Sequence, residues 1–322
     1  MSVPFLRHAA AKLQIADILE AEPLTAEALA KKLGTNTDAT FRVMRGLATT
    51  GMFRLRPDEK FENNRFSRTL LAHSPESVKD FVEYFGSKSN VDAWTNISET
   101  LKTGKNGFEN VHKMPVWDWL KLNPNEGKIF VNAMVSVTSN NAHAIASAYP
   151  FRQLKRICDV AGGQGALLGE ILVRHKFLKA ILFDEKYVLD QAKIILSKSE
   201  LLNRVSLTSG NFFETIPSGC DAYILKDILH DWDDERSLKI LGNVRRAMQN
   251  GNKLLIVEMI VPTNNTTMPG PLVDLQMMMV CCGGRQRSVG DFKNLFSQSG
   301  FEFQKIYRTS TPFSILEATA AH

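Results

Sequence analysis

Several features that would assign a function class outright are scarce or absent in this sequence of 322 residues. Its four cysteines, Cys158, Cys220, Cys281 and Cys282, form no C-x-x-C pair, so we expect neither a structural zinc site nor a dithiol redox motif. No apolar run approaches the length of a membrane span, and residues 1–8 contain no signal-peptide stretch. These absences predict a cytoplasmic protein with no metal and no membrane partner.

The sequence also lacks a large excess of charge of one sign. Lys and Arg number 39 against 34 for Asp and Glu, a net charge of +5, and the basic residues form no run. Proteins that bind nucleic acids concentrate positive charge on one surface, so no nucleic-acid partner is expected. The composition is that of an ordinary globular protein, with 44% hydrophobic and 23% charged residues, and the length suffices for two domains.

Residues 1–95 are predicted to form a small helical domain with one hairpin. Apolar residues recur at helical spacing and are bounded by capping residues and glycines. The predicted elements are helices over 5–20 and 26–33, a third helix from Asn36 or Thr37 to Gly51, and a hairpin of 52–55 with 60–62. Three helices and a hairpin make a winged helix. Arg42 and Arg45 lie on the third helix, where a DNA-reading helix would be, but two arginines are typical of an ordinary solvated face.

Helical segments continue from residue 75 to about 149. They are expected over 78–85, 91–101, 114–120 and 125–149. Phe130, Met134 and Val137 lie on one face of the last helix. Such a stripe usually belongs to a core, and the sharper interpretation is one wall of an apolar substrate pocket.

The stretch from Ile157 to Gly165 predicts a buried strand followed at once by a glycine-rich turn and an apolar helix. This unit begins many nucleotide-binding α/β sheets, although it is also common as a plain strand-to-helix turn. Asp184 ends the next strand, 19 positions past Gly165, where an acid can bind the ribose of an adenosine. A dinucleotide fingerprint needs a third glycine, and Leu168 stands in its place. A ligand without a phosphate, such as S-adenosylmethionine, is therefore favoured over a nicotinamide dinucleotide.

From Leu154 onward strands and helices alternate. Strands are expected over 157–160, 180–183, 205–208, 222–225 and 254–258, with a closing hairpin of 301–308 and 313–318. This pattern predicts a mostly parallel sheet with helices on both faces.

His230 follows the fourth of these strands, and Glu258 ends the fifth. In such sheets the carboxyl ends of the strands carry the ligand sites. His230 is therefore a candidate general base, and Glu258 could hold its imidazole in one tautomer and stabilise the cation. Taken alone, a histidine here is more often a helix cap, and a glutamate at a strand end often has no role.

The ordered motifs resemble those of the caffeic-acid and acetylserotonin type of class I O-methyltransferases. They are the turn 159–165, Phe183-Asp184, the segment 210–213, the segment 225–235 and Gly283-Gly284-Arg285-Gln286-Arg287. The resemblance covers nearly the whole chain. It implies a Rossmann-like α/β methyltransferase sheet over 96–322, with substrate-pocket helices at its start, and an otherwise all-helical winged-helix dimerisation domain over 1–95. It also implies a homodimer and a small aromatic substrate.

Residue roles follow from the resemblance. The cofactor S-adenosylmethionine, and its product S-adenosylhomocysteine, would be bound by Asp159, Gly162, Gly163, Gly165, Asp184, Asn211, Phe212 and Lys226. His230 would be the base, with Glu258 and Gln286 beside it. The substrate would lie against Phe130, Met134, Trp232, Met277 and Cys281.

The chain departs from the family pattern at three positions. Ala161 stands where the family usually has glycine, Asn211 replaces a common aspartate, and Gln286 replaces a glutamate that often flanks the base. The family also often has one more helix before the segment at Phe5, so a reduced dimer contact is expected.

The reaction that the resemblance implies is methyl transfer to a hydroxyl, expected to be phenolic, by in-line displacement. Three alternatives stay open at this point. The same fold could methylate nitrogen or run a non-methylating reaction that only uses the cofactor's charge. A winged-helix DNA-binding regulator and a nicotinamide enzyme are disfavoured by the mild charge and by Leu168, respectively.

Overall fold

The computed structural model describes residues 3–74, 76–262 and 269–321. It divides into two compact units, which we describe separately. One contains the chain up to Trp94 together with Trp117–Asn140, and the other contains Thr95–Val116 and the chain from Asn141 onward. The boundary expected after residue 95 stays a prediction for the domains.

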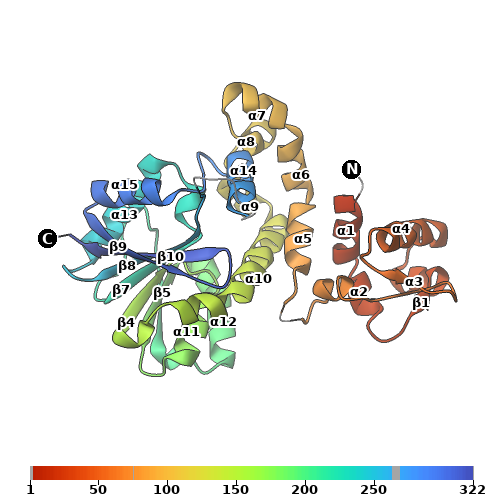
Figure 1. Cartoon of the computed structure of the whole chain (residues 1–322), viewed down its shortest axis with the longest axis horizontal. Helices are drawn as coiled ribbons and strands as arrows, with labels where there is room; N and C mark the ends of the chain where they lie inside the picture. Colours follow the sequence, from red (N-terminus) through yellow and green to blue (C-terminus); the bar gives the residue numbers. More distant parts are fainter. Residues whose placement is uncertain (1–2, 75, 263–268, 322) are drawn as a thin grey trace. The chain divides into compact units, whose positions relative to one another are not determined.

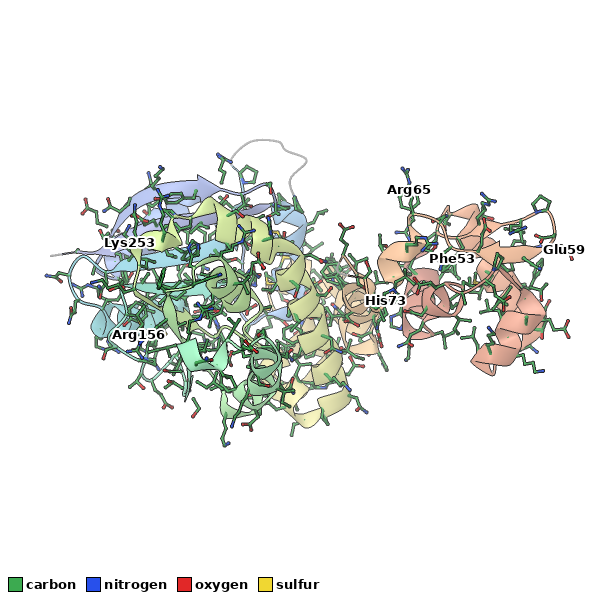
Figure 2. The ribbon with its side chains drawn as sticks, turned by 90° about the horizontal axis from the view of Figure 1, so that it is seen from below. Phe53, Glu59, Arg65, His73, Arg156 and Lys253 are labelled. Atoms are coloured by element: carbon green, nitrogen blue, oxygen red, sulfur yellow. The ribbon has the colours of Figure 1, made fainter. Side chains whose placement is uncertain are left out.

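The first unit is helical with a three-stranded wing (Figure 1). Its elements are α1 (Val3–Lys12), α2 (Ile15–Ile18), β1 (Leu24–Thr25), α3 (Ala26–Leu33), α4 (Thr37–Thr49), β2 (Arg54–Leu55), β3 (Lys60–Glu62), α5 (Lys79–Phe85), α6 (Lys88–Thr95), α9 (Val116–Leu122) and most of α10 (Pro124–Ala148). The side chains of Thr25 and Asn36 cap α3 and α4 by accepting backbone N–H groups. Phe53 is buried in this unit's core, while Glu59 lies at the tip of the wing (Figure 2).

Two helix predictions in this half were wrong in extent. The single helix expected over 5–20 is broken, because Gln14 adopts the left-handed conformation with φ 51° and separates α1 from α2. The helix expected over 91–101 is interrupted at Asn96, between α6 and α7 (Ile97–Thr103). The periodicity of the apolar residues continues across both breaks, so it could not reveal them.

The second unit is built on a seven-stranded sheet. Its strands are β4 (Arg156–Val160), β5 (Lys179–Asp184), β6 (Val205–Ser209), β7 (Ala222–Lys226), β8 (Lys253–Met259), β9 (Phe301–Arg308) and β10 (Phe313–Ala320). The spatial order is β6-β5-β4-β7-β8-β10-β9. Strands β4 to β8 are parallel, and β10 runs antiparallel to β8 and β9. The mostly parallel sheet and its closing hairpin are confirmed.

Helices cover both faces of this sheet (Figure 1). The unit's helices are α7, α8 (Gly107–His112), α11 (Ala166–Arg174), α12 (Lys186–Lys198), α13 (Asp234–Ala247), α14 (Gly270–Val280) and α15 (Val289–Gln298). In Figure 1, α11 and α12 lie on one side of the strands, and α13 and α15 lie on the other. The central strands β4, β5, β7 and β8 are mostly apolar and buried, as expected for a parallel sheet between two helical layers, whereas the strands at the two ends of the sheet, β6 and β9, are partly exposed.

Arg156 and Lys253 begin β4 and β8, so they mark the amino edge of the sheet (Figure 2). The opposite edge, where parallel strands end, carries the residues of the candidate site. Across the described ranges, no helix has both the length and the apolar character needed to cross a membrane.

Candidate active site

The carboxyl ends of five neighbouring strands bring most of the predicted site residues to one edge. Asp159 lies in β4, Asp184 ends β5, Asn211 and Phe212 follow β6, Lys226 ends β7, and Glu258 lies near the end of β8. The sequence separation between these residues is large, but the parallel pairing of β6-β5-β4-β7-β8 aligns their ends.

The glycine turn after β4 is shaped by a close approach. A Cβ atom on Gly162 would lie 2.5 Å from the carboxyl carbon of Asp159 and 2.6 Å from a methyl of Leu182, so only glycine fits. Gly163 has φ +60°, and a Cβ there would meet nothing within 4 Å. The turn is therefore tightly packed beneath Gly162 and open above Gly163.

Two acids support this turn. Asp184 accepts the Gly163 N–H at 2.8 Å and the Glu185 N–H at 2.7 Å. Burial raises the pKa of Asp184, and these two hydrogen bonds oppose the shift. Burial, together with the charge of Asp184, raises the pKa of Asp159 to about 7, although the Lys226 ammonium acts against it.

Ala161 occupies a strained position at the start of the turn. Its φ is 54°, in the left-handed region where a Cβ costs about 1–2 kcal/mol. This explains why glycine suits the position.

We expect Ala161→Gly to raise the free energy of unfolding by up to about 1 kcal/mol, because relief of the Cβ clash exceeds the added chain entropy of glycine. Urea unfolding of both variants measures this. Ala192→Gly, in the interior of α12, is the matched control and should be destabilising by about 1 kcal/mol or more. A loss of stability in both variants would contradict the strain argument.

The predicted cofactor residues after β6 and at the end of β7 make contacts with neighbouring residues of the protein. Asn211 accepts the Phe213 N–H at 2.9 Å, and the Phe212 carbonyl accepts from Asn243 at 2.7 Å. The Lys226 ammonium bonds the carboxylate of Asp227 and lies 4.7 Å from the centre of the Phe313 ring.

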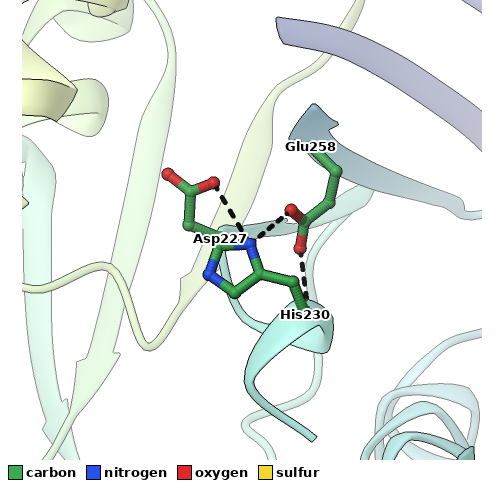
Figure 3. Close-up of side chains that lie close together, drawn as sticks. All are labelled: Asp227, His230 and Glu258. Carbon is green, nitrogen blue, oxygen red and sulfur yellow. Dashed lines mark hydrogen bonds and ion pairs between the residues drawn. The ribbon is translucent and has the colours of Figure 1, made fainter. Parts of the chain in front are cut away.

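His230 lies among three carboxylates. It sits in the 3-10 turn η4 (Leu229–Asp231), and its Nδ1 is 2.9 Å from Glu258 Oε2 and 3.7 Å from Asp227 Oδ1 (Figure 3). Its Nε2 lies 3.4 Å from Asp231 Oδ1. The backbone N–H of His230 also donates to Glu258 Oε1 at 3.4 Å. The sheet edge thus joins His230 to Glu258, which is fully buried.

This arrangement favours the imidazolium. Burial alone would lower the pKa of His230, but the charges of Glu258, Asp231 and Asp227 and the hydrogen bond to Glu258 outweigh it and raise the pKa to about 10. Burial also raises the pKa of Asp231 to about 7, against the pull of the His230 cation.

Gln286 flanks His230 at the same ring nitrogen that faces Glu258. Its Nε2 lies 3.0 Å from His230 Nδ1, and its Oε1 is buried without a hydrogen-bond partner among the described residues. A half-turn of this amide would place Oε1 against the Nδ1–H and give that proton a second acceptor. A glutamate at this position would add a fourth carboxylate around the ring.

Asp231 is a site residue that the sequence analysis missed. The Cys281 thiol donates to its carboxylate at 3.4 Å, and Met277 Sδ lies 3.8 Å from the same sulfur. Two predicted substrate residues, Met277 and Cys281, therefore lie beside the Nε2 side of His230. The available signal was the acidic run from Asp227 to Glu235, in which Asp231 is adjacent to the base.

Arg287 is the second residue that was missed. Its side chain is fully buried and donates to the carbonyls of Leu229 and Trp232, which flank the base, at 2.5 and 2.8 Å. The same guanidinium bonds Asp234 and Ser237 at the start of α13. It lies in the motif 283–287, but no sequence pattern indicates which way a buried arginine points.

The remaining predicted substrate residues fall in both units. Trp232 packs on Phe213 with ring centres 4.9 Å apart. Phe130 and Met134 lie on α10 in the first unit, where the Phe130 ring contacts Tyr84 and Trp117. Their role against a substrate stays a prediction.

The chain matches two family models. Residues 94–302 match the O-methyltransferase domain, and residues 3–73 match the O-methyltransferase dimerisation domain. These matches confirm the predicted fold class and the predicted family.

Curated relatives extend the comparison. The chain is 34% identical to a phenazine O-methyltransferase of Lysobacter antibioticus over 97% of this chain and 91% of the relative. It is 30% identical to a phenazine-1-carboxylate N-methyltransferase of Pseudomonas aeruginosa over 93% of this chain and 88% of the relative. A crystal structure of an O-methyltransferase from neocarzinostatin biosynthesis, in complex with S-adenosylmethionine and 2-hydroxy-5-methyl naphthoic acid, superposes with TM-score 0.86 at 25% identity, covering 99% of this chain and 96% of that one.

Proposed function

This chain belongs to the O-methyltransferase family and is an S-adenosylmethionine-dependent O-methyltransferase; on that premise we propose that it methylates a ring hydroxyl of a small aromatic metabolite, with His230 as the proton acceptor. The observation that carries the proposal is the contact of His230 Nδ1 with the buried Glu258 at 2.9 Å. This contact commits Nδ1 to the carboxylate and leaves Nε2 to face the acceptor oxygen.

The pKa of His230 supports this role. An unperturbed histidine titrates near 6.5 and a phenol near 10, so the transfer of a proton between them costs roughly 5 kcal/mol. With the pKa of His230 raised to about 10 by the surrounding carboxylates, against the effect of burial, that cost nearly vanishes. Proton transfer then contributes little to the activation barrier of methyl transfer, and alignment of the reacting atoms contributes more.

The glycine turn fits S-adenosylmethionine. It is open above Gly163 and has the Asp184 carboxylate beside it, and it lacks the third glycine of a pyrophosphate site. We propose that Gly162, Gly163 and Gly165 hold the amino-acid end, Asp184 the ribose, and Asn211 and Phe212 the adenine, with Asp159 and Lys226 completing the site. When bound, the cofactor supplies an electrophilic methyl group on a sulfonium. We propose that no metal takes part.

We expect Asp184→Ala to weaken binding of S-adenosylhomocysteine by about 1.5–3 kcal/mol, the worth of a hydrogen bond to a charged group. The substitution also frees the Gly163 N–H, so Asp184→Asn is the matched variant that retains an acceptor for it. Titration calorimetry gives both affinities. Unchanged affinity in Asp184→Ala would remove Asp184 from the cofactor site.

Methylation of nitrogen is the second candidate, because one relative with 30% identity is an N-methyltransferase. A screen of aromatic hydroxyls and matched amines with labelled S-adenosylmethionine, run with and without a chelator, separates the two and tests the metal. Label on hydroxyls is expected. Label on amines alone would favour the alternative, and formation of S-adenosylhomocysteine by neither class would refute both.

We also propose that the protein is a homodimer formed mainly by the segments before about Leu101. The match to a dimerisation domain supports this, as do the exposed side chains of Phe5, Leu13 and Phe66. Light scattering at micromolar concentration should give twice the chain mass of 36.0 kDa. A monomer under these conditions would contradict the proposal.

A further inference from the structure

The side chain of Asn106 joins two helices of the second unit beside the site. Asn106 is the N-cap of α8, and its Oδ1 accepts the Glu109 N–H at 3.0 Å. Its Nδ2 donates to the carbonyl oxygens of Met278 and Cys281, at 3.3 and 2.8 Å. These two carbonyls lie at the end of α14, which packs against α8 (Figure 1). One amide therefore bonds the start of α8 to the end of α14.

Only an amide serves both helix ends at once. The first N–H groups and the last carbonyls of a helix have no partner within the helix. Asn106 presents an acceptor to the start of α8 and two N–H donors to the end of α14. The neighbours also fix the orientation of the amide, because a flipped amide would place its oxygen against two carbonyl oxygens. Serine or aspartate at this position would keep the cap and lose the donors.

The Cys281 carbonyl marks the point where α14 passes into the loop that reaches His230. The Cys281 N–H closes the last turn of α14 on the Met277 carbonyl at 2.8 Å. The Gly284 N–H donates to the Cys281 carbonyl at 3.3 Å, and the Arg285 N–H donates to the His230 carbonyl at 2.8 Å. A displacement of the Cys281 carbonyl is therefore transmitted to the backbone of His230.

Met277 and Cys281, which we call the acceptor wall, also lie beside the His230 ring. The Cys281 thiol donates to Asp231 Oδ1 at 3.4 Å, and Met277 Sδ lies 3.8 Å from that sulfur. Asp231 Oδ1 is in turn 3.4 Å from His230 Nε2, the nitrogen that the proposed function directs to the acceptor oxygen. Cys281 is only 4% exposed, and close-packed interiors transmit small shifts to their neighbours. The bond from Asn106 to the Cys281 carbonyl thus bears on the acceptor wall.

We propose, on the basis of the proposed function, that Asn106 is a positioning residue for the acceptor. By holding the end of α14, it sets the distance between the acceptor wall and His230, and so the place of the hydroxyl oxygen relative to Nε2. The predicted cofactor residues lie at the ends of β4 to β7 and in the turns that follow these strands. Loss of the amide donors therefore disturbs the acceptor and leaves the cofactor in place.

Hydrogen exchange tests the contact without any acceptor. Asn106→Ser keeps a side-chain oxygen for the cap of α8 and removes both donors. With S-adenosylhomocysteine bound, we expect the amides of residues 281–285 to exchange about tenfold faster in this variant, because two hydrogen bonds that hold the segment are lost. The Gly163 amide, which Asp184 accepts, should exchange at the wild-type rate. Mass spectrometry of peptides from the two regions measures both.

Steady-state kinetics test the positioning. The probes are 2-naphthol, catechol and 4-nitrophenol, each with labelled S-adenosylmethionine. We expect Asn106→Ser to lower kcat/KM for an accepted probe by about tenfold to a hundredfold, the effect of a small misplacement of a reacting group. KM for S-adenosylmethionine should stay nearly unchanged. Asn106→Asp should lose more, because its carboxylate faces two carbonyl oxygens.

Asn36 offers a matched control. It caps α4 by accepting the Ala39 N–H at 3.0 Å, and it is exposed. Asn36→Ser exchanges one capping oxygen for another, so it should alter neither the exchange of residues 281–285 nor kcat/KM for the probe.

Unchanged exchange over residues 281–285 in Asn106→Ser would overturn the proposal, as would the same losses in Asn36→Ser. Faster exchange with full kcat/KM for the probe would also overturn it, since the contact would then serve the fold alone. An equal loss in KM for S-adenosylmethionine would show a general loosening of the unit and remove the positioning role.

Failure of the proposal is distinguishable from failure of the proposed function. A protein that methylates a probe and whose exchange ignores Asn106→Ser keeps the proposed function and loses Asn106 as a positioning residue. A wild-type protein that transfers label to no ring hydroxyl loses the proposed function, and the positioning of an acceptor falls with it, even if exchange over residues 281–285 still depends on Asn106.

Discussion

Replacement of His230 by alanine should lower kcat by roughly 10²–10⁴-fold, the range found for a positioned proton-transfer group. The variant loses the proposed proton acceptor, and it leaves the buried carboxyl groups of Glu258 and Asp231 without their partner. Binding of S-adenosylhomocysteine should change little, because the glycine turn and Asp184 carry the predicted cofactor contacts. Turnover from pH 6 to pH 10 and calorimetry of the product complex measure the two effects.

Conservative changes around the ring serve as controls. Glu258→Gln retains the hydrogen-bond geometry and should cost less than loss of the imidazole. By lowering the pKa of His230 from about 10, it should also move the rising limb of the pH profile to lower pH. Gln286→Glu raises that pKa and should move the same limb to higher pH. A base accepts a proton only in its neutral form, so activity that depends on His230 rises as pH rises through its pKa.

Nearly full activity of His230→Ala at every pH would show that the enzyme works by proximity alone on a reactive acceptor. If Glu258→Gln did not shift the rising limb of the pH profile, that would be independent evidence that the pKa of His230 does not control the rate. Neither result would alter the family assignment, which is based on the match over residues 94–302.

Much of the fold could be predicted because its signals are local. Thr25 and Gly34 bound α3 at both ends as expected, since a side-chain acceptor and a left-handed glycine are the ordinary ends of a helix. The strands β4 to β8 were predicted from short apolar runs between helices. The break at Gln14 was not, because a left-handed glutamine leaves no mark on apolar spacing.

The site residues likewise include some that could be predicted from the sequence and some that could not. His230 and Glu258 could be paired from the sequence, since His230 follows β7, Glu258 lies near the end of β8, and these parallel strands end at one edge. The roles of Asp231 and Arg287 could not, because they depend on where a side chain points from a short turn. The loop after α14 approaches His230 so closely that a Cβ on Gly284 would lie 2.7 Å from the His230 carbonyl oxygen. That approach is a property of tertiary packing and is visible only in the structure.

Arg287 follows from this packing, and it is a positioning residue for the base. The backbone N–H of Arg285 donates to the His230 carbonyl at 2.8 Å, and the Arg287 guanidinium binds the carbonyls of Leu229 and Trp232. These three contacts therefore hold the backbone at His230 and on both sides of it. Only a planar guanidinium presents enough donors in a fixed geometry to satisfy both carbonyls together with Asp234 and Ser237.

We expect Arg287→Met to lower the free energy of unfolding by about 3–5 kcal/mol, the usual cost of breaking a buried charged network. Arg287→Lys keeps the charge but cannot span both carbonyls, so it should fold and lose kcat by roughly tenfold or more, the price of a small misplacement of a reacting group. KM for S-adenosylmethionine should stay nearly unchanged, since the cofactor residues lie on other strands. Arg236→Gln is the matched control: the Arg236 side chain is 43% exposed and pairs with Asp233 at 3.5 Å, so its loss should cost less than about 1 kcal/mol.

Urea unfolding and steady-state kinetics of the three variants test this prediction. Equal losses in kcat and in cofactor affinity for Arg287→Lys would show a general loosening of the unit, and full activity would show that η4 keeps its position without the guanidinium.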